Sequence, residues 1–374
     1  MRKKVLLTGA GFTHNFGAPL SNGMWSWIFN DLTSGSSIKR KMREEYNYEF
    51  LYNHILQNDN DYRIEEKTEF IKAVYDAYAY IDKLIDRAIL YQLTADGYLS
   101  KSNNEIGISV VNLLKFLNLF SVKSGSGYIF TLNQDIMIEK LFQSVNMSNS
   151  IMPFSKSVCI PAVHSPVYKP KVTTSGDKEY GIIPDKEELQ EWKDKHLDSL
   201  DIKGTRTNPI YIKLHGSFDW RYPRHSNTNM QDINNKVMVI GGEKGRQIDK
   251  IPLLKFYFDL FEKSLFSKVD LMIIGYGFRD AHINKVLIKA IKEHDLRLYF
   301  VNPNSFKTFG ENIKDEGVFD NGHEYKIITN AIDGYYQATL SKIFPFDGNE
   351  DTIAQNIGSN TPIWSQINKS YFDL

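Results

Sequence analysis

The stretch KKVLLTGAG at residues 3–11 decides the fold that the rest of the chain is expected to adopt. An apolar run fills this stretch up to Thr8 and stops at the glycine turn Gly9–Gly11. The pattern is typical of a buried parallel strand that leads into a phosphate-binding loop. Glycines there let backbone N–H groups approach a diphosphate at the N-terminus of a helix. By itself the turn is a weak signal, because many α/β proteins use Gly-x-Gly only to turn tightly.

Short β-rich runs recur along the chain after this first strand. They are Tyr128–Thr131, Ile210–Leu214, Val237–Ile240, Leu271–Ile274, Leu296–Val301 and Tyr325–Ile328. Several are followed by helix-like segments, which is the alternation of a parallel α/β sheet. The sequence therefore predicts a Rossmann-like parallel sheet with helices on both faces.

A helical block interrupts this alternation at about residues 38–123. One apolar stripe with alternating four- and three-residue spacing runs along it, as on an amphipathic helix: Phe70, Val74, Ala77, Ile81, Leu84 and Ala88. A further helix is expected at about Ile106–Phe120. We interpret the block as an insertion into one domain at 1–345, followed by a tail at 346–374 whose role the pattern does not indicate. An enlarged core is the favoured explanation of the stripe, and an interaction surface is the alternative.

Composition excludes several classes of protein. The 374 residues contain 45 Lys and Arg against 45 Asp and Glu, so no overall basic field attracts nucleic acid or anionic lipid. No apolar run reaches the roughly 18–20 residues of a membrane span. Cys159 is the one cysteine, so no internal disulfide can form, which fits a reducing compartment. We therefore expect a cytoplasmic protein.

Polar side chains follow two of the predicted strands at their carboxyl ends. Asn133 and Asp135 come after one strand, and His215 comes after the next. Ligands of open α/β sheets bind at this edge. An amide that orients water and an imidazole that acts as a general base form a pair able to cleave a glycosidic bond. The alternatives are an Asx turn for Asn133 and a turn-capping role for His215.

Four strings together resemble the NAD-binding core of the sirtuins. They are Gly9-Ala10-Gly11-Phe12, Thr131-Leu132-Asn133-Gln134-Asp135, Leu214-His215-Gly216-Ser217, and Gly275-Tyr276-Gly277 with the later Val301-Asn302. The second is similar to the sirtuin Thr-Gln-Asn-Ile-Asp string, and the third matches the string that carries the sirtuin catalytic histidine. The resemblance implies that NAD+ is the substrate, and that Gly275 and Asn302 lie near its adenosine ribose. The motifs span about two-thirds of the chain.

The departures from the sirtuin pattern are equally informative. A zinc ribbon needs four thiolates or imidazoles, normally as paired Cys-x-x-Cys, and this chain has one cysteine. Gln134 replaces an apolar residue of the family string. Asp280 and His282 resemble an extended string of bacterial sirtuin-like defence proteins, and we interpret them as supporting or capping groups. No metal cofactor is expected.

The closest overall resemblance is to zinc-less sirtuin-like NAD hydrolases of bacterial antiphage systems. It implies an NAD glycohydrolase that depletes cellular NAD in abortive infection and is controlled by oligomerisation or a companion defence protein. In the expected complex the diphosphate lies over Gly9–Gly11 and Asp135 helps to seat the nicotinamide carboxamide. Asn133 then holds the attacking water, and His215 removes a proton from the ribose hydroxyl or from that water.

Three other functions remain open at this point. The chain could be a regulatory module that senses NAD or ADP-ribose without catalysis, although a pure sensor has no need of both Asn133 and His215. It could transfer ADP-ribose to a protein or nucleic acid in place of water. An oxidoreductase is the least favoured, because Asp31 stands at the distance of a ribose-binding acid but does not follow a strand-like segment.

Overall fold

A computed structural model describes residues 2–57, 61–90, 107–122, 127–144, 171–172, 178–179, 181–200, 210–222, 236–315, 319, 323–346 and 361–373. Cys159 lies outside the described residues. Among the described helices, none is long and apolar enough to cross a lipid bilayer.

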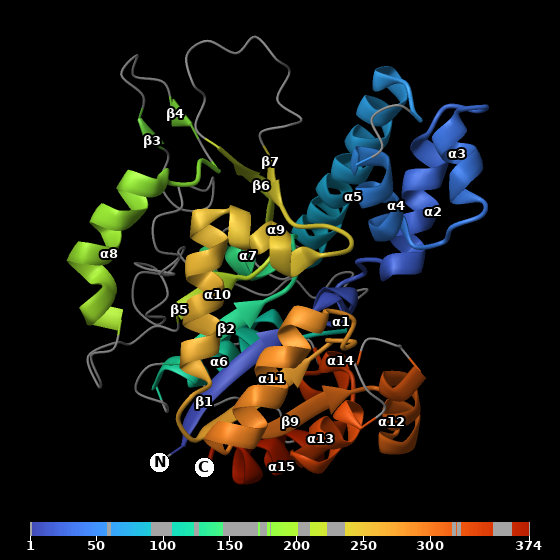
Figure 1. The fold of residues 1–374 in the computed structure, drawn as a ribbon. Helices are drawn as coiled ribbons and strands as arrows, with labels where there is room; N and C mark the ends of the chain where they lie inside the picture. Colours follow the sequence, from blue (N-terminus) through green and yellow to red (C-terminus); the bar gives the residue numbers. More distant parts are fainter. Residues whose placement is uncertain are drawn as a thin grey trace.

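A six-stranded parallel sheet forms the centre of the molecule (Figure 1). Its strands are β1 (Lys3–Thr8), β2 (Tyr128–Thr131), β5 (Ile210–Lys213), β8 (Val269–Ile274), β9 (Arg297–Asn302) and β10 (Ile332–Gln337). Their order across the sheet is β10-β9-β8-β1-β2-β5, and every neighbouring pair is parallel. Counted along the chain and starting from β5, this is the 3-2-1-4-5-6 order of a Rossmann fold. The predicted parallel α/β class is confirmed.

Helices surround this sheet (Figure 1). In the first half of the chain they are α1 (Ala10–His14), α2 (Ser21–Asp31), α3 (Ser37–Met42), α4 (Tyr48–Gln57), α5 (Ile64–Leu90), α6 (Val110–Val122) and α7 (Met137–Ser144). In the second half they are α8 (Lys186–Leu200), α9 (Lys244–Lys250), α10 (Pro252–Ser264), α11 (Ala281–His294), α12 (Phe306–Asp315), α13 (Glu324–Asn330), α14 (Leu340–Ile343) and α15 (Pro362–Ser370). Asp31 belongs to α2, so it does not end a strand, in agreement with its rejection as a ribose ligand.

The predicted apolar stripe lies on α5. Phe70, Val74, Ala77 and Ile81 are all buried, because this helix packs against α2, α4 and the site-proximal strand β6 (Gly216–Arg221). Leu84 is half-buried beside the buried Ile85. The side chain of Ala88 lies outside the described residues. The stripe therefore joins the helical block to the core of the domain, as the favoured interpretation expected.

Two of the predicted strands differ in the structure. The strand expected at Tyr325–Ile328 is wrong, because these residues belong to helix α13 and the last strand, β10, begins at Ile332. A short apolar run fits either a strand or a helix, and only Ile328 of this run is buried. The strand expected at Val237–Ile240 exists as β7 (Lys236–Met238), but it pairs antiparallel with β6 outside the main sheet. Two further short strands, β3 (Lys171–Val172) and β4 (Lys178–Glu179), form a separate pair.

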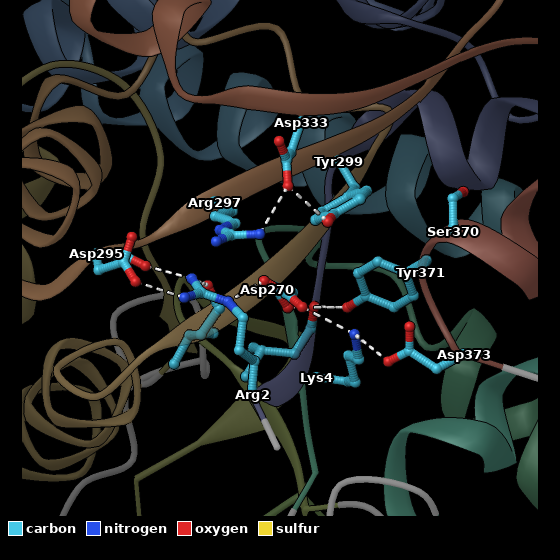
Figure 2. A network of polar contacts seen from close by, with 12 residues as sticks. Arg2, Lys4, Asp270, Asp295, Arg297, Tyr299, Asp333, Ser370, Tyr371 and Asp373 are labelled. Carbon is cyan, nitrogen blue, oxygen red and sulfur yellow. Dashed lines mark hydrogen bonds and ion pairs between the residues drawn. The ribbon is translucent and has the colours of Figure 1, made fainter.

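The end of the chain returns to the sheet at the amino ends of its strands (Figure 2). Tyr371 is fully buried, and its hydroxyl donates to the carbonyl oxygens of Val5 in β1 (3.1 Å) and Asp270 in β8 (2.9 Å). The Asp270 carboxylate accepts from Arg2 Nε at 2.5 Å and from Lys4 Nζ at 2.8 Å. The residues after α15 therefore close the edge opposite the predicted site.

We expect Asp270→Asn to lower the free energy of unfolding by about 1.5–3 kcal/mol, because a buried carboxylate that is hydrogen-bonded to two cations is lost. Arg2 and Lys4 then keep only the exposed carboxylates of Asp295 and Asp373 as counter-charges. The Asp270 side chain is 4% exposed. Asp333→Asn is the matched control, since Asp333 also pairs with an arginine but is 47% exposed and should cost less than about 1 kcal/mol. Urea unfolding of both variants measures the difference. Equal losses would show that the buried pair contributes no more than a surface one.

Candidate active site

The register of four neighbouring strands brings the predicted motifs into one row at the carboxyl edge of the sheet. The last paired residues, in order across the sheet, are Ile274, Thr8, Thr131 and Lys213. Two positions further along each strand stand Tyr276, Ala10, Asn133 and His215. The row spans β1 and β8, whose following segments leave in opposite directions across the sheet. This is the topological switch point at which open α/β sheets bind ligands.

Two glycine loops meet at this switch point, backbone against backbone. The N–H of Gly9 donates to the carbonyl of Ile274 (3.0 Å), and the N–H of Gly11 donates to that of Gly275 (2.9 Å). Gly275 has φ +72°, and a Cβ there would lie 2.1 Å from the nitrogen of Phe12. The close approach of two backbone segments thus explains why glycines occupy these positions. Binding of a diphosphate at Gly9–Gly11 stays a prediction, and these two N–H groups already have partners within the protein.

We expect Gly275→Ala to lower the stability by at least about 1–3 kcal/mol, because it adds backbone strain at positive φ and overlaps with rigid backbone atoms. Gly277→Ala is the control in the same loop, since a Cβ at Gly277 meets nothing within 4 Å. Thermal unfolding of the two variants should separate them clearly. A Gly275→Ala protein as stable as the wild type would show that the loops can move apart without cost.

Asn133 and Asp135 are held together by a hydroxyl of the first loop. Asn133 Nδ2 donates to the carbonyl of Gly9 (3.0 Å) and to Thr13 Oγ1 (2.8 Å), and Thr13 Oγ1 donates to Asp135 Oδ2 (3.0 Å). Both amide hydrogens of Asn133 are used, so a ligand would meet its Oδ1 acceptor. Asp135 Oδ1 accepts from the N–H of Met137 (3.1 Å) at the start of α7. Thr13 was not among the predicted site residues, because a threonine in a short helix has no distinctive pattern.

A buried ion pair lies beneath these two residues. Lys213 Nζ is 2.9 Å from Glu139 Oε1, donates to the backbone carbonyl of Asp135, and is completely buried. The Tyr211 hydroxyl donates to Glu139 Oε2 at 2.9 Å. Burial raises the pKa of Asp135, and Lys213 opposes the rise. Lys213 therefore holds the backbone of the Asn133–Asp135 turn in place from below.

Gln134 connects the helical block to the site. Its Oε1 accepts from the Tyr78 hydroxyl of α5 (3.2 Å), and its Nε2 donates to the carbonyl of Val239 (3.1 Å). Its own backbone carbonyl accepts from Ser217 Oγ (3.1 Å), directly after the His215–Gly216 pair. The two partners of the side chain, Tyr78 and Val239, explain why a glutamine stands at this position.

We expect Gln134→Leu to lower the free energy of unfolding by about 1–3 kcal/mol for each buried group that it leaves without a partner. Tyr78→Phe should cost less in this background than in the wild type, since both partners of the Tyr78–Gln134 hydrogen bond are then apolar and only the bond to Tyr48 is lost. Tyr80→Phe is the control on the same helix, because Tyr80 is 45% exposed. A double-mutant cycle measures the coupling. Strict additivity would mean that the Tyr78–Gln134 contact contributes nothing.

His215 lies in a cluster of titratable groups. Its Nε2 is 3.0 Å from Nε2 of His282, and the ring is 1% exposed. Burial lowers the pKa of His215 to about 3, Asp280 opposes this, and Lys244 and His282 lower it further. Burial also lowers the pKa of His282, to about 4. Both rings are therefore neutral near pH 7, the state in which an imidazole can accept a proton.

Lys244 joins this cluster to the helical block. Its Nζ is 2.9 Å from Asp280 Oδ1 and 2.8 Å from Glu49 Oε2 of α4. Burial acts to raise the pKa of Asp280, but Lys244 and the two histidines outweigh it and hold the value at about 2. Asp280 is thus an anion beside two neutral imidazoles. His282 contacts His215, as a supporting group would, whereas the Asp280 side chain makes no cap hydrogen bond to α11 and pairs with Lys244. No local pattern in the sequence indicated Lys244 or Glu49.

A hollow of 310 Å³ opens beside the cluster, between α9, α10 and α11. His282 lies in its wall, together with Gly245, Phe258 and Val286. Of the predicted NAD-contacting residues, none lies in this wall. His215 does not line the hollow either, and His282 lies between the two.

The other predicted binding residues face different surroundings. Phe12 is fully buried, so only its backbone is placed to meet a ligand. The Tyr276 hydroxyl points inward and donates to Asn284 Oδ1 (2.8 Å) in α11. Asn302 is half-buried at the end of β9, and its Oδ1 accepts from the N–H of Asn304 (2.9 Å). Asn302 follows Val301, the register partner of Ile274, so it stands next to the Gly275 loop.

Comparison with known proteins gives structural neighbours only. No protein-family model matches the chain, and no curated protein matches it significantly. The structural neighbours are Sir2 homologues. One, in complex with 2'-O-acetyl ADP ribose, has 12% identity and a TM-score of 0.38, with 91% of this chain and 88% of that chain covered. Another, in complex with ADP ribose, has 11% identity and a TM-score of 0.36, with the same coverage.

A third neighbour is Sir2Tm bound to a propionylated peptide, with 12% identity and a TM-score of 0.35. The alignment covers 91% of this chain and 89% of the Sir2Tm chain. Because the identities and TM-scores are this low, the assignment of the fold rests on the strand order and register of the protein itself.

Proposed function

We propose that the protein is an NAD+ glycohydrolase that cleaves the bond between nicotinamide and ribose. The observation that carries the proposal is the equivalent placement of Asn133 and His215, each two residues past the paired ends of adjacent strands. Both stand beside the glycine loops at the switch point of the sheet. A neutral imidazole with the Asp280 carboxylate nearby, and an amide with its acceptor oxygen available, supply the groups that hydrolysis needs.

In the proposed complex NAD+ lies across the carboxyl edge. Its diphosphate meets the N-terminus of α1 after Gly9, and its adenosine ribose lies near Gly275–Gly277 and Asn302. The nicotinamide ribose then reaches Asn133 and His215, and Asp135 helps to seat the carboxamide. The order of these residues along the edge follows the register of the strands.

The reaction proceeds through an oxocarbenium-like state. The bond from ribose C1′ to the pyridinium nitrogen breaks with both electrons passing to nitrogen, which releases neutral nicotinamide. A water held by Asn133 Oδ1 adds to C1′, and its proton passes to His215. Asp280 stabilises the resulting imidazolium, because its negative charge acts to raise the pKa of His215. The products are nicotinamide, ADP-ribose and a proton.

Such an enzyme destroys an essential cofactor, so we propose that it acts in bacterial antiphage defence and is kept inactive by oligomerisation or a companion protein. This role is supported by the zinc-less sirtuin-like sequence pattern. The helical block supports control by a partner, because it carries exposed apolar side chains and contacts the site through Gln134 and Lys244. Tyr46, Phe50 and Ile64 are 68%, 52% and 70% exposed.

We expect His215→Ala and Asn133→Ala each to lower the turnover of NAD+ by about 10²–10⁴-fold, the usual contribution of general acid–base catalysis. The measurement is nicotinamide release by the purified chain, alone and with proteins encoded beside it. His294→Ala is the matched control, because His294 ends α11 at the opposite edge of the sheet, where its carbonyl meets Lys268 before β8.

The same assay separates the competing functions. Wild-type turnover in both site variants would overturn the assignment of the catalytic pair. NAD+ binding without nicotinamide release under any condition would indicate a sensor. Label from NAD+ that becomes attached to a protein or nucleic acid would indicate ADP-ribosyl transfer in place of hydrolysis.

A further inference from the structure

Three side chains able to bind a metal ion, His215, Asp280 and His282, lie close together. One ligand atom from each residue lies within 4.8 Å of the other two, and the two Nε2 atoms are 3.0 Å apart. Two nitrogens that are each about 2.0–2.1 Å from one Zn²⁺ lie about 3.0–3.4 Å apart at bond angles of about 95–110°. The spacing of the rings therefore suits two bonds to a single ion with little movement.

The ring of His215 is held in the orientation that a ligand needs. Besides the contact with His282, the ring hydrogen-bonds to the backbone of Leu132. Because Nε2 faces His282, the N–H that donates to the Leu132 carbonyl is on Nδ1. The lone pair of Nε2 then points into the cluster. A metal-binding histidine commonly donates its other N–H to a backbone carbonyl or carboxylate in this way.

The charges of the surroundings also suit a divalent cation. Glu49 and Asp280 contribute two negative charges and Lys244 contributes one positive charge, so the group carries a net charge of −1 while the rings are neutral. Lys244 bonds to Asp280 Oδ1, which leaves Oδ2 of the same carboxylate for an ion. Neutral imidazoles and an ionised carboxylate are the forms in which these side chains bind metals.

A path for an ion is present as well. His282 lies in the wall of the 310 Å³ hollow, which also has room for a water as a fourth ligand. Two imidazoles, one carboxylate and one water are the ligand set of zinc sites with an open position, whereas Mg²⁺ and Ca²⁺ prefer oxygen ligands alone. A metal was not expected from the sequence, because His215 is remote from Asp280 and His282 along the chain.

We propose that His215, Asp280 and His282 bind one Zn²⁺ ion. Resting on the proposed function, a consequence is that the ion withholds Nε2 of His215 from proton transfer, so that zinc inhibits hydrolysis of NAD+. The site would make the enzyme responsive to the zinc available in its surroundings.

The binding test uses the full chain after dialysis against a chelator and does not involve NAD+. We expect calorimetric titration with ZnCl₂ to give one ion per chain, and Co²⁺ to give visible d–d absorption bands. His282→Gln and Asp280→Asn should each weaken binding at least about tenfold, as loss of groups around a metal does. Cys159→Ser and His294→Ala are controls that should bind as the wild type does.

Thermal unfolding of each variant shows whether it is folded, so that lost zinc binding can be distinguished from misfolding. Zinc should raise the melting temperature of the wild type and of Cys159→Ser, and should raise it less in His282→Gln, because a ligand stabilises only the state that binds it. Equal zinc affinity in His282→Gln and the wild type, or no binding by the wild type, would overturn the site.

The inhibition test compares nicotinamide release by metal-free protein with and without stoichiometric zinc. A fall with zinc supports the assignment of His215 Nε2 as both ligand and base. An increase would overturn the inhibitory role. Zinc binding by a protein that never releases nicotinamide would overturn the proposed function and leave the metal site supported.

Discussion

The contact between the two glycine loops is the constraint on which the rest of the site depends. Gly9 and Gly11 pack against Gly275 without side chains between them, and this lets β1 and β8 run side by side to their last residues. Because the following segments then leave in opposite directions, the topological switch point of the sheet lies between these two strands. Any bulkier residue would push the loops apart and move Asn133, which hydrogen-bonds to the Gly9 carbonyl.

The polar groups that are buried around this contact form hydrogen bonds and ion pairs with one another. These bonds connect parts of the chain that are distant in sequence. Thr13 links the first loop to Asn133 and Asp135, while Gln134 links the same turn to α5. Lys244 links the His215 cluster to Glu49 of α4. The helical insertion therefore supports the site at two places, through Tyr78 and through Glu49. An insertion that only enlarged the core would not need these polar contacts.

The sequence predicts the parts of this arrangement that follow from local patterns. Strand periodicity places Asn133 and His215 at the carboxyl edge, because parallel strands end there together. The contact between His215 and His282 could not be predicted, since nothing in either local pattern indicates that the two rings meet. Gln134 was unexplained for the same reason, because its partner Tyr78 lies in the insertion. The strand expected at Tyr325–Ile328 shows the opposite failure, a local pattern that tertiary packing overrides.

The environment of His215 explains both why the ring is neutral near pH 7 and why it is a weak base. Burial keeps the ring neutral but also makes it a weak base, with its pKa lowered to about 3. Asp280 counteracts this, and Lys244 weakens the effect of Asp280 because it neutralises the same carboxylate. Lys244 is shared between Asp280 and Glu49, so α4 takes part in setting the charge around His215. The surroundings of His215 are thus connected to the helical insertion, which carries most of the exposed large apolar side chains of the described surface.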